Sequence, residues 1–245
     1  MTQEIKAIIY DCGNTLLKGR PTIDELCEVA FDEFEVYTVP EQLQAALPDV
    51  TAFFHERQGS EGIAFYNSDD SAGRFWRDYY LEAFRRAGLE QDSELLNALA
   101  VRLNAWYNEP AQWVVFDDAW GALAEGEKRG LVQGVVSDWG SDLVAILSSL
   151  GLTRFFDFVV ASAVVGHAKP STEIFRYALD RGGLQPGECV YVGDTYIADV
   201  LGARASGLTP VLVDRRGHNH RFDCLTITSL DGLFVALDET AGARV

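Results

Sequence analysis

The chain has 245 residues, of which 48% are hydrophobic and 23% are charged, and this composition excludes disordered and collagen-like proteins. The length is enough for one large domain or two modest ones with an ordinary hydrophobic core. The formal net charge of -17 argues against nucleic acid or an anionic membrane as a partner, because both would repel the chain.

Cysteine usage and the N-terminus predict the compartment. The four cysteines form no CxxC pair and have no histidine at zinc-ligand spacing; they are Cys12, Cys27, Cys189 and Cys224. We expect reduced, mostly buried thiols. The N-terminus enters an apolar strand without the features of a signal peptide, and no window approaches transmembrane length. The expected compartment is the cytoplasm.

The first predicted strand covers residues 6–10, an apolar run that ends at Asp11 and is followed by turn residues. A carboxylate is therefore expected at the carboxyl end of a buried strand. From residue 22 to residue 113, apolar and aromatic residues recur largely at helical spacing with few strand signals. This part of the chain is predicted to be helical.

After Pro110, apolar strands alternate with amphipathic helices. Strands are expected at residues 132–136, 158–161, 189–192 and 210–213. Helices are expected at residues 117–129, 141–150, 171–181, 198–205 and 230–236. Alternating units of this size predict a parallel sheet with helices on both faces and ligands beyond the carboxyl ends of its strands.

The helical part is inserted after the first strand. We therefore expect a Rossmann-like α/β core made of residues 1–18 and 114–245, and a helical cap made of residues 19–113. Linkers are expected near residues 16–21 and 109–115, and the cap should form a lid over the site.

Five polar residues fall at strand ends or helix starts of the predicted sheet: Asp11, Ser137, Lys169, Asp194 and Asp199. Each alone is a weak signal, because Asp and Ser are common helix caps and Lys is common on surfaces. Together they indicate a phosphate and metal site, since phosphoryl transfer needs a nucleophile, a divalent cation and donors that neutralise charge. An Mg²⁺ shared by Asp11 and Asp194 would turn the repulsion between carboxylate and phosphate into attraction.

Four segments, in order, resemble the motifs of the haloacid dehalogenase-like (HAD) superfamily. Residues 8–16, IIYDCGNTL, resemble the first motif, an apolar strand ending in D-x-D-G-T-L. Residues 134–138, GVVSD, resemble the second, and residues 169–170, KP, resemble the third. Residues 193–199, GDTYIAD, match the fourth, G-D-x-x-x-x-D. The resemblance covers almost the whole chain and includes an inserted helical cap like that of the metabolite phosphatases in this superfamily.

The resemblance implies an Mg²⁺-dependent hydrolase that attacks a small phosphorylated metabolite with Asp11 and forms an aspartyl-phosphate. The implied phosphate-binding residues are Ser137, Asp138 and Lys169, and Ser137 and Lys169 are also implied to act with Asp11 in catalysis. The implied metal ligands are Asp11, the Gly13 carbonyl and Asp194. Asp199 would orient the water shell of the metal or Lys169. Neither the metabolite nor the oligomeric state follows from the sequence.

The chain departs from the family pattern at Gly13, where the phosphatases usually carry a second Asp that protonates the leaving alcohol and later activates water. Because glycine carries no proton, another group substitutes, the leaving group needs no acid, or turnover is slow. Two other functions stay open. A haloacid dehalogenase needs no acid for its departing halide, although Asp194 favours phosphoryl chemistry. The other is a non-catalytic binding protein with this fold.

Three further features each have two interpretations. Trp139 either lines the substrate cavity or packs in a loop, and packing is the commoner role. His167 either transfers the missing proton or lies in solvent, which is the commoner case for a loop histidine. Residues 215–221, RRGHNHR, either attract an anion or form an exposed basic loop.

Overall fold

A strand of four fully buried residues, β1 (Ala7–Tyr10), lies inside the sheet of the computed structural model, which describes residues 4–61, 66–90, 92–217 and 222–242. It pairs with β4 (Val132–Ser137) on one side and β6 (Cys189–Gly193) on the other. The sheet has six strands, in the order β5-β4-β1-β6-β7-β8, and its pairings are parallel. The remaining strands are β5 (Phe158–Ala161), β7 (Thr209–Val213) and β8 (Leu225–Ile227).

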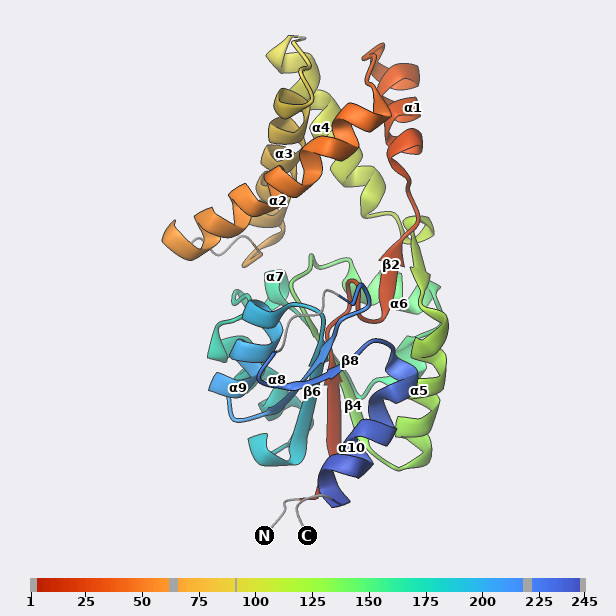
Figure 1. Ribbon diagram of the computed structural model, residues 1–245, viewed down its shortest axis with the longest axis vertical. Coiled ribbons are helices and arrows are strands. Elements are labelled where there is room, and N and C mark those ends of the chain that lie inside the picture. Colours follow the sequence, from red (N-terminus) through yellow and green to blue (C-terminus); the bar gives the residue numbers. More distant parts are fainter. Residues whose placement is uncertain (1–3, 62–65, 91, 218–221, 243–245) are drawn as a thin grey trace.

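Helices cover both faces of the sheet (Figure 1), so alternate residues of β1 enter two different cores. Ile8 and Tyr10 pack with α5 (Asp117–Lys128), α6 (Leu143–Ser149) and α10 (Leu233–Gly242). Ala7 and Ile9 pack with α8 (Thr172–Gly182) and α9 (Gly202–Ala205). Burial on both faces explains why β1 is apolar throughout rather than alternating.

Four helices between β2 and β3 form a separate hydrophobic cluster: α1 (Ile23–Phe34), α2 (Pro40–Glu61), α3 (Asp69–Arg86) and α4 (Ser93–Tyr107). Figure 1 shows them as a layer set apart from the sheet along the long axis of the molecule. A capping box between Thr22 and Glu25 begins α1, and a Ser68 cap begins α3. In the described parts of the chain, no helix combines the length and apolar character needed to span a membrane.

The chain enters and leaves the helical layer through a two-stranded antiparallel ribbon, where linkers were expected. Strand β2 (Leu17–Gly19) pairs with β3 (Trp113–Val115), which follows the 3₁₀-helix η1 (Pro110–Gln112). The ribbon holds the two connections between the sheet and the helical layer side by side. The predicted boundaries at residues 18–19 and 113–114 fall inside it and stay a prediction.

The remaining elements differ from expectation mainly in length and type. The helix expected at residues 198–205 is a π-helix, η4 (Tyr196–Leu201), continued by α9. The helix expected at residues 230–236 is the 3₁₀-helix η5 (Leu230–Gly232) followed by α10. Strand β8 was not predicted because three residues are too few for a periodic signal. The other short helices are η2 (Thr153–Phe155), α7 (Ser162–Val165) and η3 (Pro186–Glu188).

Candidate active site

The predicted polar residues meet where three neighbouring strands end. Asp11 follows β1, Ser137 is the last residue of β4, and Asp194 follows β6. Lys169 lies in the loop before α8, and Asp199 lies in η4. The exposed fractions of four of these residues are 5% for Asp11, 2% for Ser137, 4% for Lys169 and 1% for Asp199. Burying this many charges costs free energy unless they are paired, so their partners define the site.

Lys169 is the buried cation that joins these groups. Its Nζ donates to Asp11 Oδ1 at 2.7 Å and to Asp199 Oδ1 at 2.6 Å. A third bond runs to the hydroxyl of Tyr191 at 3.2 Å, which gives all three ammonium hydrogens a partner. Burial alone would lower the pKa of Lys169, but the two carboxylates outweigh it and hold the pKa well above its usual value. The ammonium therefore stays charged.

Asp11 is oriented through one of its two carboxylate oxygens. Ser137 Oγ donates to Asp11 Oδ1 at 2.9 Å, and Lys169 donates to the same atom. Within the described residues, both hydrogen bonds that reach this carboxylate end on Oδ1, so Oδ2 is left for a reacting group or a cation. Burial raises the pKa of Asp11; Lys169 opposes the rise, and Asp199 adds to it.

Three carboxylates form an acidic cluster. One oxygen from each of Asp11, Asp194 and Asp199 lies within 4.8 Å of the others. Burial and the two neighbouring carboxylates raise the pKa of Asp194 to about 7. Carboxylates this close repel one another, and a hard divalent cation with oxygen ligands relieves that repulsion.

Asp199 is the member of the cluster least suited to ligate a metal. Its Oδ1 accepts from Lys169, and its Oδ2 accepts the backbone N–H of Thr195 at 2.8 Å. Both of its oxygens are thus engaged, whereas Asp194 Oδ1 accepts only the Thr195 hydroxyl, at 3.3 Å, within the described residues. The donor set fits a cation held by Asp11 and Asp194, with Asp199 orienting Lys169.

Asp138 lies next to Ser137 and links two parts of the site. Its Oδ1 accepts the backbone N–H of Lys169 at 2.9 Å, which holds the loop before α8 against the end of β4. Burial raises the pKa of Asp138 to about 7. The contact is to the protein backbone, and the predicted contact with phosphate stays a prediction.

Tyr191, a fully buried residue of β6, belongs to the site although no sequence motif predicted it. Its hydroxyl lies 2.8 Å from the carbonyl oxygen of Val136 and 3.2 Å from Asp199 Oδ1, and it also contacts Lys169. A buried tyrosine hydroxyl needs a polar partner, so a tyrosine inside an apolar strand was the available signal. Tyr191 therefore helps to position the Lys169–Asp199 ion pair from inside β6.

Arg215, the first residue of the basic stretch, is bound to the loop that follows Asp11. Its Nε donates to the carbonyl oxygen of Asn14 at 3.0 Å, and one terminal nitrogen donates to that of Thr15 at 2.7 Å. Asp118 pairs with the guanidinium at 2.7 Å. Asn14 has a left-handed φ of 56°, so this turn is tight and gains from the two bonds. Arg215 is therefore neither an anion site nor part of a free loop.

Trp139 packs, as the commoner interpretation held, and also lies beside the loop that follows Asp11. Its ring centroid is 4.6 Å from that of Trp113 in β3. A Cβ placed on Gly13 would meet the Trp139 ring at 3.5 Å. His167 is exposed, as expected of a loop histidine. Residues 218–221 of the basic stretch lie outside the described residues.

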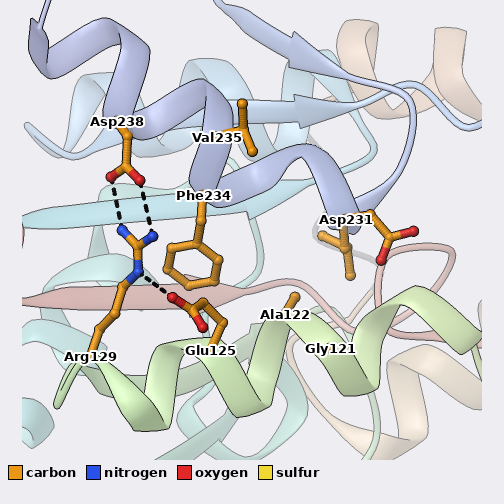
Figure 2. A pocket seen from close by; sticks show the side chains of 9 residues that line it. Gly121, Ala122, Glu125, Arg129, Asp231, Phe234, Val235 and Asp238 are labelled. Atoms are coloured by element: carbon orange, nitrogen blue, oxygen red, sulfur yellow. Dashed lines mark hydrogen bonds and ion pairs between the residues drawn. The ribbon is translucent and has the colours of Figure 1, made fainter.

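A cavity of about 350 Å³ lies elsewhere, between α5 and α10 (Figure 2). Its only lining cation, Arg129, is bound to Asp238 at 2.8 Å and to Glu125 at 2.9 Å, and stacks on the Phe234 ring at 4.4 Å. The positive charge is already neutralised, and none of the residues of the carboxylate cluster lines this cavity. The cavity therefore lies apart from the carboxylate cluster.

The chain is similar to known proteins over most of its length. The family profile described as haloacid dehalogenase-like hydrolase matches residues 5–207. The mouse haloacid dehalogenase-like hydrolase domain-containing protein 3 is 32% identical over 216 residues, which cover 86% of this chain and 82% of that protein. A phosphoserine phosphatase from Thermus thermophilus is 31% identical over 234 residues, which cover 86% of this chain and 89% of that protein.

A solved structure shares the fold at lower identity. YfnB from Bacillus subtilis, whose structure was determined bound to magnesium, aligns with 96% of this chain and 100% of its own, with a TM-score of 0.77 and 16% identity. The matched profile covers all four motifs, from the strand before Asp11 to the segment that contains Asp194 and Asp199. On this evidence the chain belongs to the haloacid dehalogenase-like hydrolases and is an enzyme.

Proposed function

We propose that this protein is an Mg²⁺-dependent phosphomonoester hydrolase that acts on a small phosphorylated metabolite through an aspartyl-phosphate on Asp11. The observation that carries the proposal is the acidic cluster in which one oxygen of the half-buried Asp194 lies within 4.8 Å of one oxygen each of the buried Asp11 and Asp199. A dehalogenase needs no cation to release halide, so it gains nothing from a third carboxylate beside the nucleophile. A phosphatase gains a metal site.

The arrangement of the residues supports in-line attack on phosphorus. Asp11 is held by Ser137 and Lys169, so its free oxygen is aimed without the entropy cost of orienting it during the reaction. As the bond from this oxygen to phosphorus forms, the bond from phosphorus to the leaving oxygen breaks. Ser137 and Lys169 are the proposed donors to the transferred phosphoryl oxygens, and to reach them each would exchange its hydrogen bond to Asp11 Oδ1 for one to phosphate.

A bound Mg²⁺, held by Asp11 and Asp194 with the Gly13 carbonyl as a further ligand, would neutralise charge on the transferred phosphoryl group. Asp199 keeps Lys169 charged and in place during the reaction, because it is buried against the ammonium at 2.6 Å. Water then hydrolyses the aspartyl-phosphate and returns Asp11 to its carboxylate form.

The proposed domain arrangement places a helical cap, residues 19–113, over a core made of residues 1–18 and 114–245. A contact between the two supports a lid: Asp69, at the start of α3, accepts the backbone N–H of Ser141 at 2.7 Å. Ser141 follows Trp139 in the loop after β4. A cap held against this loop would exclude water and select the substrate.

The test is hydrolysis of p-nitrophenyl phosphate, whose leaving group departs without an acid. We expect turnover that needs Mg²⁺, is abolished by EDTA and is lost in Asp11→Asn. Asp194→Asn should raise the Mg²⁺ concentration needed for half-maximal activity, since it removes a proposed ligand. The matched control is Asp142→Asn, which changes a carboxylate in the loop after Ser141 that has no proposed metal contact.

The alternatives give different results. Halide release from 2-haloacids without metal, together with no phosphatase activity, would identify a dehalogenase. Binding of Mg²⁺ with neither activity would favour the non-catalytic protein. Activity that EDTA leaves unchanged would refute the proposed metal site.

A further inference from the structure

The space beside Gly13 is bounded by an aromatic ring. A Cβ built on Gly13 would lie 3.5 Å from the Trp139 ring, which is an ordinary van der Waals contact, and Gly13 has no left-handed φ. Because the family's acid usually stands at this position, this is the leaving-group side of the nucleophile. In this chain that side carries an indole instead of a carboxyl group.

Trp139 is held rigidly on the core. Its backbone N–H donates to Ser162 Oγ at 3.1 Å, and its carbonyl oxygen accepts the N–H of Ala163 at 3.1 Å. Its ring packs against that of Trp113, with the two ring centroids 4.6 Å apart and the ring planes inclined by 58°. The ring is thus fixed from both its backbone and its side chain, and a preorganised surface of this kind binds without an ordering cost.

Asp138, the carboxylate next to Trp139 in the sequence, is engaged in another contact. The Asp138 carboxylate precedes Trp139 and its pKa is raised by burial to about 7, but its Oδ1 is occupied by the backbone N–H of Lys169 at 2.9 Å. His167, the other candidate from the sequence, is exposed. Asp138 is engaged by the loop before α8 and His167 lies in solvent, so the group that the structure shows beside Gly13 is the Trp139 ring.

We propose that Trp139 forms the leaving-group subsite, and that this enzyme prefers phosphate esters whose leaving oxygen is attached to a flat unsaturated group, an aryl or enol ester. The proposal rests on the proposed phosphatase function. In the step, the bond from Asp11 to phosphorus forms and the electron pair of the breaking bond leaves on the oxygen. The ring or enol delocalises that charge, and water later supplies the proton.

Two physical effects favour this class. A phenol has a pKa of about 10, so its anion departs without the protonation that an alkyl alcohol requires. General acid catalysis is worth about 10²- to 10⁴-fold, which is the handicap expected for alkyl esters when the acid is missing. A planar leaving group also stacks on the indole, whereas a small alkyl group does not.

The experiment compares kcat/KM for p-nitrophenyl phosphate, phenyl phosphate and ethyl phosphate in the presence of Mg²⁺. We expect kcat/KM to fall as the leaving group becomes less acidic, and ethyl phosphate to react at least about 100-fold more slowly than phenyl phosphate. Gly13→Asp should raise the ratio of kcat/KM for ethyl phosphate to kcat/KM for p-nitrophenyl phosphate at least about 10-fold, because the acid helps only the poor leaving group.

Trp139→Leu should raise KM for phenyl phosphate about 3- to 10-fold and leave KM for ethyl phosphate unchanged, because only the aryl group stacks. Trp139→Phe keeps an aromatic surface, so its KM for phenyl phosphate should lie between those of the wild type and Trp139→Leu. This result separates a loss of stacking from a loss of folding. Asp138→Asn tests whether Asp138 protonates the leaving group. If it lowered kcat/KM for ethyl phosphate much more than for p-nitrophenyl phosphate, Asp138 would be the acid and the proposal would be wrong.

The failures are distinguishable. Equal kcat/KM values for ethyl and phenyl phosphate would overturn the leaving-group proposal and leave the phosphatase function standing. An equal effect of Trp139→Leu on all three substrates would overturn the subsite. No hydrolysis of any of the three by a folded protein would overturn the phosphatase function itself, and the leaving-group proposal with it.

Discussion

Replacing Asp199 with Asn tests whether the buried charges hold the sheet end together. Asp199 and Lys169 are 1% and 4% exposed, and their charged atoms lie 2.6 Å apart. Removing one partner of a buried ion pair costs about 3–5 kcal/mol, because the other charge is left without compensation. Lys169 keeps Asp11 at 2.7 Å, so we expect the lower end, about 3 kcal/mol of unfolding free energy.

The assay is urea unfolding at neutral pH with EDTA, so that no metal compensates for the lost charge. The matched control is Glu33→Gln, which breaks an ion pair of similar length, 2.8 Å to Arg102, whose side chains are 40% and 33% exposed. An exposed pair contributes at most about 1 kcal/mol. The difference between the two losses of unfolding free energy therefore separates the effect of burying an ion pair from the effect of forming it.

A double-mutant cycle sharpens the test. Lys169→Met together with Asp199→Asn should cost less than the sum of the single variants, because neither charge is then left alone. A loss below about 1 kcal/mol for Asp199→Asn, no larger than that of the exposed control, would refute the reasoning. It would mean that water or a relaxed side chain already stabilises Lys169.

Three further predictions follow from single contacts. Arg215→Lys should lower kcat/KM for p-nitrophenyl phosphate about 10-fold or more, because a lysine lacks the planar fork that bridges the Asn14 and Thr15 carbonyls; unchanged kinetics would show that the loop is held otherwise. Tyr191→Phe should destabilise the protein by about 1–3 kcal/mol in urea unfolding, because the buried Val136 carbonyl loses a hydrogen bond, and a neutral effect would contradict this. The pKa of Glu82 is lowered to about 2, chiefly by a hydrogen bond from Arg85, so the ionised side chain stabilises the folded protein. Glu82→Gln should therefore destabilise the protein above pH 4.5. That loss should vanish as the pH falls toward 2, and a pH-independent loss would exclude the ion pair as its cause.

The α/β core was predictable because its signals are local. A buried strand is a short apolar run, and an amphipathic helix repeats at about 3.6 residues, so β1 and most core helices were found within a few positions. The catalytic candidates were predictable for the same reason, since each follows a strand or precedes a helix. The ribbon of β2 and β3 was not, because its three-residue strands are defined by a partner almost a hundred positions away.

The sequence by itself determined which residue types stand at the strand ends, and thereby the family, the proposed nucleophile Asp11 and the glycine at position 13. Only the tertiary structure decided how their neighbours are used. Tyr191 supports Lys169 from a buried strand, Arg215 binds the loop after Asp11 from the far end of the chain, and Trp139 lies beside Gly13. These contacts join residues distant in sequence, so no local pattern encodes them; packing and the pairing of buried charges select them.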